Sequence, residues 1–264
     1  RMALAYDQMG QADQAIDFYE RALEIDPANP LALRSLAAHA ESRQEWARAL
    51  ELKERLLLVL DDENERLQLT LELGQMCQHQ LGQHHQAIDF YRQAFMIQPE
   101  NVEILYRMLE LFELTQQWVD MIDTLEQLLQ LEGDTERQIQ YNFRIAELYQ
   151  NMLQNAEMAV AYYNRVLDIN FLHEAAFQAI ETMLFNMQQW QLLDENYRLM
   201  IKRLPQDESQ QQMKLDLWRK LGDLYRYKLE NIDNAVMAYE LVYKMEPSVK
   251  NLEVLAELYG QKDE

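Results

Sequence analysis

One cysteine and three histidines form the most chemically suggestive cluster in the sequence. Cys77, His79, His84 and His85 lie close together along the chain, and thiolate and imidazole groups could in principle hold Zn²⁺ or Ni²⁺. His84 and His85, however, fall at the start of a predicted helix, where polar residues are expected. We therefore favour a structural role for the cluster and predict no metal site. Because Cys77 is the only cysteine, an internal disulfide is excluded.

The remaining reactive side chains form no recognisable catalytic constellation. The sequence contains no Gly-rich phosphate loop, no His-Glu-x-x-His and no Cys-x-x-Cys, and no serine is paired with a histidine in a known motif. Acidic runs at Asp61-Asp62-Glu63 and Asp207-Glu208 open predicted helices, which favours a role as caps and helix-dipole partners. The sequence therefore predicts a protein that is not an enzyme, with no catalytic residue and no cofactor.

The composition indicates a helical protein with an acidic surface. Hydrophobic residues make up 48% of the chain, which has only 6 glycines and 5 prolines, and its formal net charge is −21. Such a charge repels nucleic acids and anionic membranes, and no apolar run reaches the roughly 20 residues of a membrane span. A basic protein partner is compatible with this charge, although acidity also serves solubility. We expect a cytoplasmic protein without membrane insertion, and the periplasm stays open.

An internal repeat organises the whole chain. A block of the form Ala-x3-Tyr recurs at intervals of 72, 72 and 76 residues, and a tryptophan recurs every 72 residues between the blocks. The blocks start at Ala15, Ala87, Ala159 and Ala235, and the tryptophans are Trp46, Trp118 and Trp190. A small residue lets two helices approach closely, and the tyrosine one turn later fills the same face. The period predicts stacked helix pairs, two pairs in every 72 residues.

These blocks resemble the tetratricopeptide repeat (TPR), as does Leu221-Gly222-x2-Tyr225 in the helix before the last block. Weaker copies are Leu73-Gly74-x2-Cys77, which predicts that Cys77 is buried, and Ile145-Ala146-x2-Tyr149.

The resemblance implies an all-α solenoid, a right-handed superhelix of about seven helix–turn–helix motifs plus a partial eighth, in a single array over 1–264. First helices are expected near 1–9, 29–42, 63–80, 100–115, 134–152, 172–187 and 207–228, and an eighth near 248–259. The third, fifth and seventh motifs carry one extra residue before their alanine. Because the chain begins at Arg1 inside a helical pattern, we expect a fragment of a longer, bacterial-type array.

The resemblance also implies a concave groove, lined by the first helices, that holds a peptide or partner protein. Residues placed in that groove are Tyr106, Arg107, Glu110, Phe143, Arg144, Glu147, Arg219 and Lys220. Aromatic and arginine side chains often anchor interfaces, so the two aromatic-Arg doublets are predicted to be the anchor, with little role in stability. The alternative is that Arg107–Glu110 and Arg144–Glu147 are ordinary surface pairs. Gln68 and Glu72 stand where the family's carboxylate clamp needs Lys and Asn, so recognition of a chaperone C-terminus is not expected.

The predicted function is that of a non-enzymatic protein–protein interaction scaffold. Two alternatives stay open at this point. The first is a structural subunit that assembles with copies of itself as a homo-oligomer. The second is a regulatory or targeting region of a larger enzyme, or of a secretion or assembly system.

Overall fold

The computed structural model describes residues 1–205 and 208–263, apart from the side chains of Glu208 and Asp263. The chain divides into two compact units, Arg1–Leu131 (unit 1) and Glu132–Glu264 (unit 2). Within the described residues both units consist of helices, and neither contains a strand. This confirms the predicted all-α repeat architecture, whereas the superhelical hand and the single continuous array remain predictions. No described helix combines the length and the apolar character that crossing a bilayer requires.

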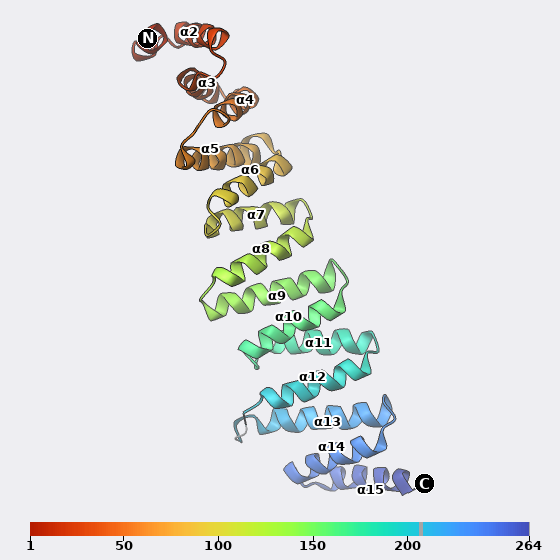
Figure 1. Ribbon diagram of the computed structural model, residues 1–264. Coiled ribbons are helices and arrows are strands. Elements are labelled where there is room, and N and C mark those ends of the chain that lie inside the picture. The colour runs from red at the N-terminus through yellow and green to blue at the C-terminus, as the bar shows by residue number, and fades with distance from the viewer. Residues whose placement is uncertain (206–207, 264) are drawn as a thin grey trace. The chain divides into compact units, whose positions relative to one another are not determined.

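Unit 1 contains four helix–turn–helix motifs. The first helices of these motifs are α1 (Met2–Gln8), α3 (Pro30–Ser42), α5 (Glu63–Met76) and α7 (Val102–Leu114). The second helices are α2 (Ala12–Ile25), α4 (Trp46–Leu57), α6 (His84–Ile97) and α8 (Trp118–Leu131). The two helices of each motif lie side by side and are joined by a short turn (Figure 1).

The described residues of unit 2 form three further motifs, a short 3₁₀ turn (Glu208–Gln210) before the last of them, and one additional helix. Its first helices are α9 (Thr135–Asn151), α11 (Glu174–Asn186) and α13 (Gln211–Tyr227), and its second helices are α10 (Ala156–Ile169), α12 (Trp190–Arg203) and α14 (Ile232–Met245). The last helix, α15 (Val249–Asp263), packs on α14 and stands at the predicted start of an eighth motif. All eight first helices therefore appear close to their predicted ranges.

The turn between the two helices of each motif contains one residue with a positive φ angle. These residues are Gly10, Gln44, Gly82, Gln116, Gln154, Gln188 and Glu230, with φ between 50° and 71°. A residue in this left-handed conformation commonly ends a helix, because it lets the following amide groups bond back to the last carbonyls. In motif 2, for example, the Glu45 amide donates to the Ala40 carbonyl at 2.8 Å. The repeated turn explains the regular reversal of chain direction.

The extra residue of the third motif is absorbed by a π-helical turn. This turn, Cys77–Leu81, directly follows α5, and a wider turn of this kind accommodates one inserted residue without ending the helix. The fifth and seventh motifs close with the same wide backbone bond as the third: the Asn155 amide donates to the Tyr149 carbonyl and the Asn231 amide to the Tyr225 carbonyl, as the Gln83 amide does to the Cys77 carbonyl. Helices α9 and α13 have 17 residues, whereas α3, α7 and α11 have 13.

The alanines of the repeat block are buried where the helices pack against one another. Ala15, Ala87, Ala159 and Ala235 are all 0% exposed, and the tyrosines four residues later are buried beside them. Close approach is also visible at Gly222, where an added Cβ would lie 2.5 Å from the ring of Tyr239. The predicted packing role of these blocks is confirmed.

Cys77 is fully buried, as its repeat position predicts. Burial, together with the negative charge of Glu54, raises the pKa of its thiol from 9.0 to about 11. Because the thiolate is the reactive form, this leaves roughly 100-fold less reactive species at pH 8. We therefore expect a bulky thiol reagent to label Cys77 slowly in native buffer and at a normal rate in denaturant. Rapid native labelling with unchanged circular dichroism would contradict the burial of Cys77.

Candidate functional site

In each unit a cavity opens between two successive first helices. The unit 1 cavity, about 520 Å³, lies between α3 and α5 with one wall from α4. The unit 2 cavity, about 490 Å³, lies between α11 and α13. Both volumes fall within the roughly 300–1,000 Å³ of binding pockets. Each cavity lies between the first helix of an even motif and the first helix of the next odd motif. The two cavities therefore occupy the same position in the repeat.

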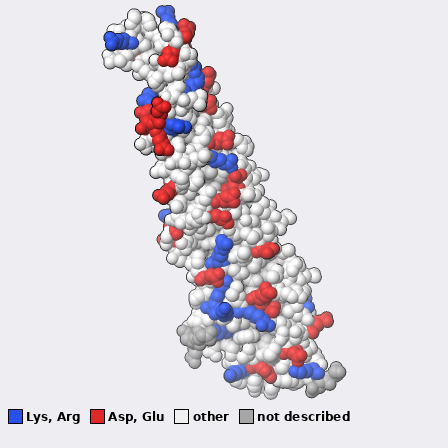
Figure 2. Space-filling view, in the orientation of Figure 1, with Lys and Arg blue, Asp and Glu red and all other residues white. Residues whose placement is uncertain are grey.

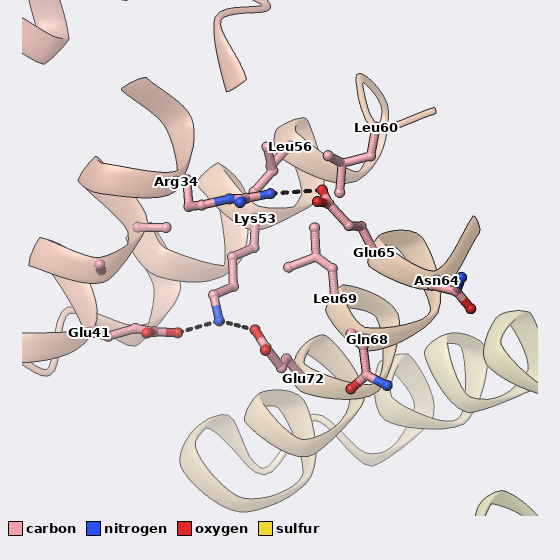
Figure 3. Close-up of a pocket in the computed structure, with 12 residues that line it drawn as sticks. Arg34, Glu41, Lys53, Leu56, Leu60, Asn64, Glu65, Gln68, Leu69 and Glu72 are labelled. Carbon is pink, nitrogen blue, oxygen red and sulfur yellow. Dashed lines mark hydrogen bonds and ion pairs between the residues drawn. The ribbon is translucent and has the colours of Figure 1, made fainter. Parts of the chain in front are cut away.

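Charged side chains line the rim of the unit 1 cavity (Figure 3). Arg34 on α3 donates to Glu65 on α5 at 2.9 Å. Lys53 on α4 bridges two carboxylates, with its Nζ 2.6 Å from Glu41 and 2.8 Å from Glu72. The three helices around this cavity are therefore joined by ion pairs across its rim.

The floor of the unit 1 cavity is aliphatic. Ala37, Leu56 and Leu69 line it and are between 1% and 7% exposed. Leu60, in the turn after α4, extends this surface towards the opening. A partner side chain entering between the ion pairs would meet apolar surface.

Lys53 is an unusual residue for its position in the repeat. The equivalent places in later motifs hold Leu125 and Tyr197, both buried, whereas the Lys53 side chain is 12% exposed. Burial disfavours its charge, but hydrogen bonds to Glu41 and Glu72 outweigh that effect and raise its pKa. Lys53 was not predicted as a groove residue, because only residues of the first helices were expected to line the groove. The available signal was that Lys53 is the one lysine in residues 1–131.

The unit 2 cavity contains Arg219 and Lys220, both predicted as groove residues. The Lys220 Nζ lies 2.5 Å from a Glu181 oxygen and 5.5 Å from the centre of the Phe177 ring. Arg219 pairs with Glu246 and lies 3.6 Å from Asp216. These cations are thus held in place by neighbouring carboxylates.

The apolar lining of the unit 2 cavity differs from that of unit 1. Phe177, Met213 and Leu217 supply it. At its edge the Tyr197 hydroxyl donates to Glu181 at 2.5 Å. Burial, followed by the bond to Glu181, raises the pKa of Tyr197, so this hydroxyl stays protonated and can act as a donor.

The predicted residues Tyr106, Arg107 and Glu110 lie on α7 in unit 1. Tyr106 is 38% exposed. Arg107 pairs with Glu103 at 2.7 Å, one turn earlier on the helix, instead of with Glu110. The surface pair considered for Arg107 therefore exists, but with a different carboxylate.

The predicted residues Phe143, Arg144 and Glu147 lie on α9 in unit 2. The Phe143 ring is half-buried, with its centre 5.3 Å from that of Tyr163 and 5.2 Å from that of His173. Because its ring packs against α10 and the turn before α11, we expect Phe143 to contribute more to stability than the repeat pattern alone predicts. Arg144 and Glu147 form a loose pair at 3.6 Å.

The cysteine–histidine cluster is not gathered into a metal site. Cys77 is in the core, while His79 and His85 are exposed. Over the described part of the chain, no three His, Cys, Asp or Glu side chains are placed to hold a metal ion.

The predicted capping role of the acidic runs is confirmed at Asp62. Its side chain accepts from the Glu65 amide at 2.8 Å, which satisfies a free donor at the start of α5. Asp207 and the side chain of Glu208 lie outside the described residues.

Comparisons with known proteins support the repeat assignment. The family model described as "Tetratricopeptide repeat" matches residues 1–29, and a second model of the same description matches residues 71–101 and 215–249. No curated protein sequence matches the chain significantly.

Several solved structures are similar to this chain. The structure of Naa15/Naa10 bound to HypK-THB is 14% identical, with a TM-score of 0.51, and the match covers 98% of this chain and 38% of that one. A TPR protein from Parabacteroides merdae is 15% identical, with a TM-score of 0.38 and coverage of 97% and 95%. The C-terminal part of a TPR repeat-containing protein from Cytophaga hutchinsonii is 12% identical, with a TM-score of 0.39 and coverage of 96% and 98%. At these identities the likeness concerns the fold alone.

Proposed function

We propose that this chain, a tetratricopeptide-repeat protein, is a non-enzymatic scaffold that holds segments of a partner protein between its first helices. Repeats of this family serve generally as protein–protein interaction scaffolds. We place one binding groove in each unit, at the cavity between an even motif and the next odd motif.

The observation that carries this proposal is the recurrence of the cavity at one repeat position. In both units the space is bounded by two first helices and combines an apolar floor with charged side chains near its opening. Interfaces commonly combine an apolar centre with a polar rim in this way. On the face shown in Figure 2, basic and acidic groups are interspersed, so partner selection would depend on local side chains more than on one large patch.

Filling a cavity should weaken partner binding. Ala38 and Gln178 are exposed residues that line the unit 1 and unit 2 cavities, respectively. We expect Ala38→Trp or Gln178→Trp to raise the Kd at least tenfold, about 1.4 kcal/mol, because the indole occupies the space of a partner side chain. The partner is first isolated by affinity pull-down with the chain, and the Kd is then measured by isothermal titration calorimetry.

The matched controls place tryptophan on exposed second-helix positions outside both cavities. Asp123→Trp on α8 and Glu195→Trp on α12 serve this purpose, and each should leave the Kd within about twofold. If both cavity variants keep wild-type affinity while a second-helix variant loses it, the partner binds elsewhere and the proposal fails. Glu132 and Asp134 would be poor controls, because Asp134 caps α9 and Glu132 bonds to Arg137.

A further inference from the structure

We infer that the unit 1 cavity selects a basic peptide segment that carries an aliphatic side chain. The inference rests on the proposed function, since it names the partner chemistry of one of the two grooves. It is carried by the charges at the rim, the lining of the floor and a comparison with the equivalent cavity in unit 2.

The rim of the unit 1 cavity has spare capacity for cations. Three carboxylates face two basic groups, and both basic groups are already paired within the protein. The side chains of Glu65 and Glu72 are 52% and 56% exposed. A carboxylate offers about four lone-pair sites, so each can accept a further charge-assisted bond from a partner Lys or Arg.

An acidic segment would meet an unfavourable site. To reach Lys53, its carboxylate would have to come close to Glu41 and Glu72, which already lie within 2.8 Å of the ammonium group and would repel it. It would also approach a unit in which 23 Asp and Glu outnumber 10 Lys and Arg over residues 1–131. Such a field attracts basic segments and repels acidic ones.

The floor of the unit 1 cavity offers apolar contact to an aliphatic side chain. Ala37, Leu56 and Leu69 line the floor and are all aliphatic and buried. A leucine or methionine flanked by basic residues would cover this surface while its neighbours reach Glu65 and Glu72. The charged and apolar parts of the site thus require two features in one short segment.

The equivalent cavity in unit 2 lacks this arrangement. The repeat positions of Glu41 and Lys53 hold Phe185 and Tyr197 there, and the position of Glu72 holds Lys220. Lys220 lies over the Phe177 ring, where unit 1 has no corresponding cation. The selectivity is therefore specific to unit 1, and unit 2 supplies a matched control within the same chain.

The test uses three short fluorescein-labelled peptides of equal length and the whole chain. The first peptide combines lysine, leucine and serine, the second replaces each lysine with glutamate, and the third replaces each leucine with serine. Fluorescence anisotropy at fixed ionic strength gives the Kd values. The lysine–leucine peptide should bind at least tenfold more tightly than either relative.

Charge removal then locates the site. Glu65→Gln with Glu72→Gln should weaken binding of the lysine–leucine peptide about tenfold. Glu174→Gln with Asp216→Asn, which removes the same charge from the unit 2 cavity, should change it less than twofold. Circular dichroism and the Tm verify that both double variants are folded, as expected for rim side chains.

The outcomes separate this inference from the proposed function. Equal weakening by the two double variants, or equal binding of the lysine–leucine and lysine–serine peptides, would show general charge attraction and overturn the inference. If Ala38→Trp abolishes binding of the natural partner but the peptides show no preference, the groove proposal stands and the inference fails. If neither Ala38→Trp nor Gln178→Trp changes the Kd for the natural partner, the proposed function itself fails.

Discussion

Replacing Ala159 with leucine should lower the free energy of unfolding by roughly 1–3 kcal/mol, the usual cost of overpacking a filled core. Ala159 is 0% exposed and lies on α10, which packs closely against α9 in unit 2. Three additional carbon atoms can be accommodated only by moving the two helices apart or by forcing side chains from their preferred rotamers. Urea denaturation followed by circular dichroism measures the effect, and Ala87→Leu in α6 should behave alike.

The control for this substitution is two residues away on the same helix. Ala161 is exposed on α10, so Ala161→Leu changes helix propensity and volume without entering the core. Its effect should stay within about 0.5 kcal/mol. Equal stability of the Ala159 and Ala161 variants would mean that the repeat block does not mark the helix contact.

Truncating Phe143 to alanine should destabilise unit 2 by about 2 kcal/mol. Full truncation of a buried phenylalanine costs about 3–5 kcal/mol, and the half-buried ring of Phe143 loses part of that burial and its contacts with Tyr163 and His173. The adjacent Arg144→Ala should cost less than about 1 kcal/mol, because Arg144 and Glu147 form an exposed pair.

Thermal and urea unfolding of the two variants distinguishes packing from surface roles within one doublet. A Phe143→Ala variant as stable as Arg144→Ala would contradict the packing role of the Phe143 ring. It would return Phe143 to the role first predicted for it, as a surface residue available to a partner.

The helix architecture could be predicted because its signals are local and repeated. Trp46, Trp118 and Trp190 mark the first residues of α4, α8 and α12, at the interval expected from the sequence. The alanine and tyrosine of each block lie on the same buried face because residues four apart share one face of a helix. The positions of the helices in one motif therefore predict those in the neighbouring motifs.

The pairing of charged side chains could not be predicted in the same way. Arg107 contacts Glu103 and not Glu110, although both lie one turn away on α7. Lys53 lines the groove because α4 forms a wall between α3 and α5. Such contacts depend on how closely helices from different motifs approach, which the repeat pattern does not specify.

Site-specific photocrosslinking tests most directly whether the grooves hold the partner. A photoreactive phenylalanine analogue is placed singly at Ala38 and Gln178, which line the cavities, and at Asp123 and Glu195 on the second helices. After irradiation of the complex, mass spectrometry locates the adducts. We expect the partner to crosslink from Ala38, Gln178 or both, and not from the second-helix positions. Adducts formed only from Asp123 or Glu195 would contradict groove binding and place the partner on the second helices.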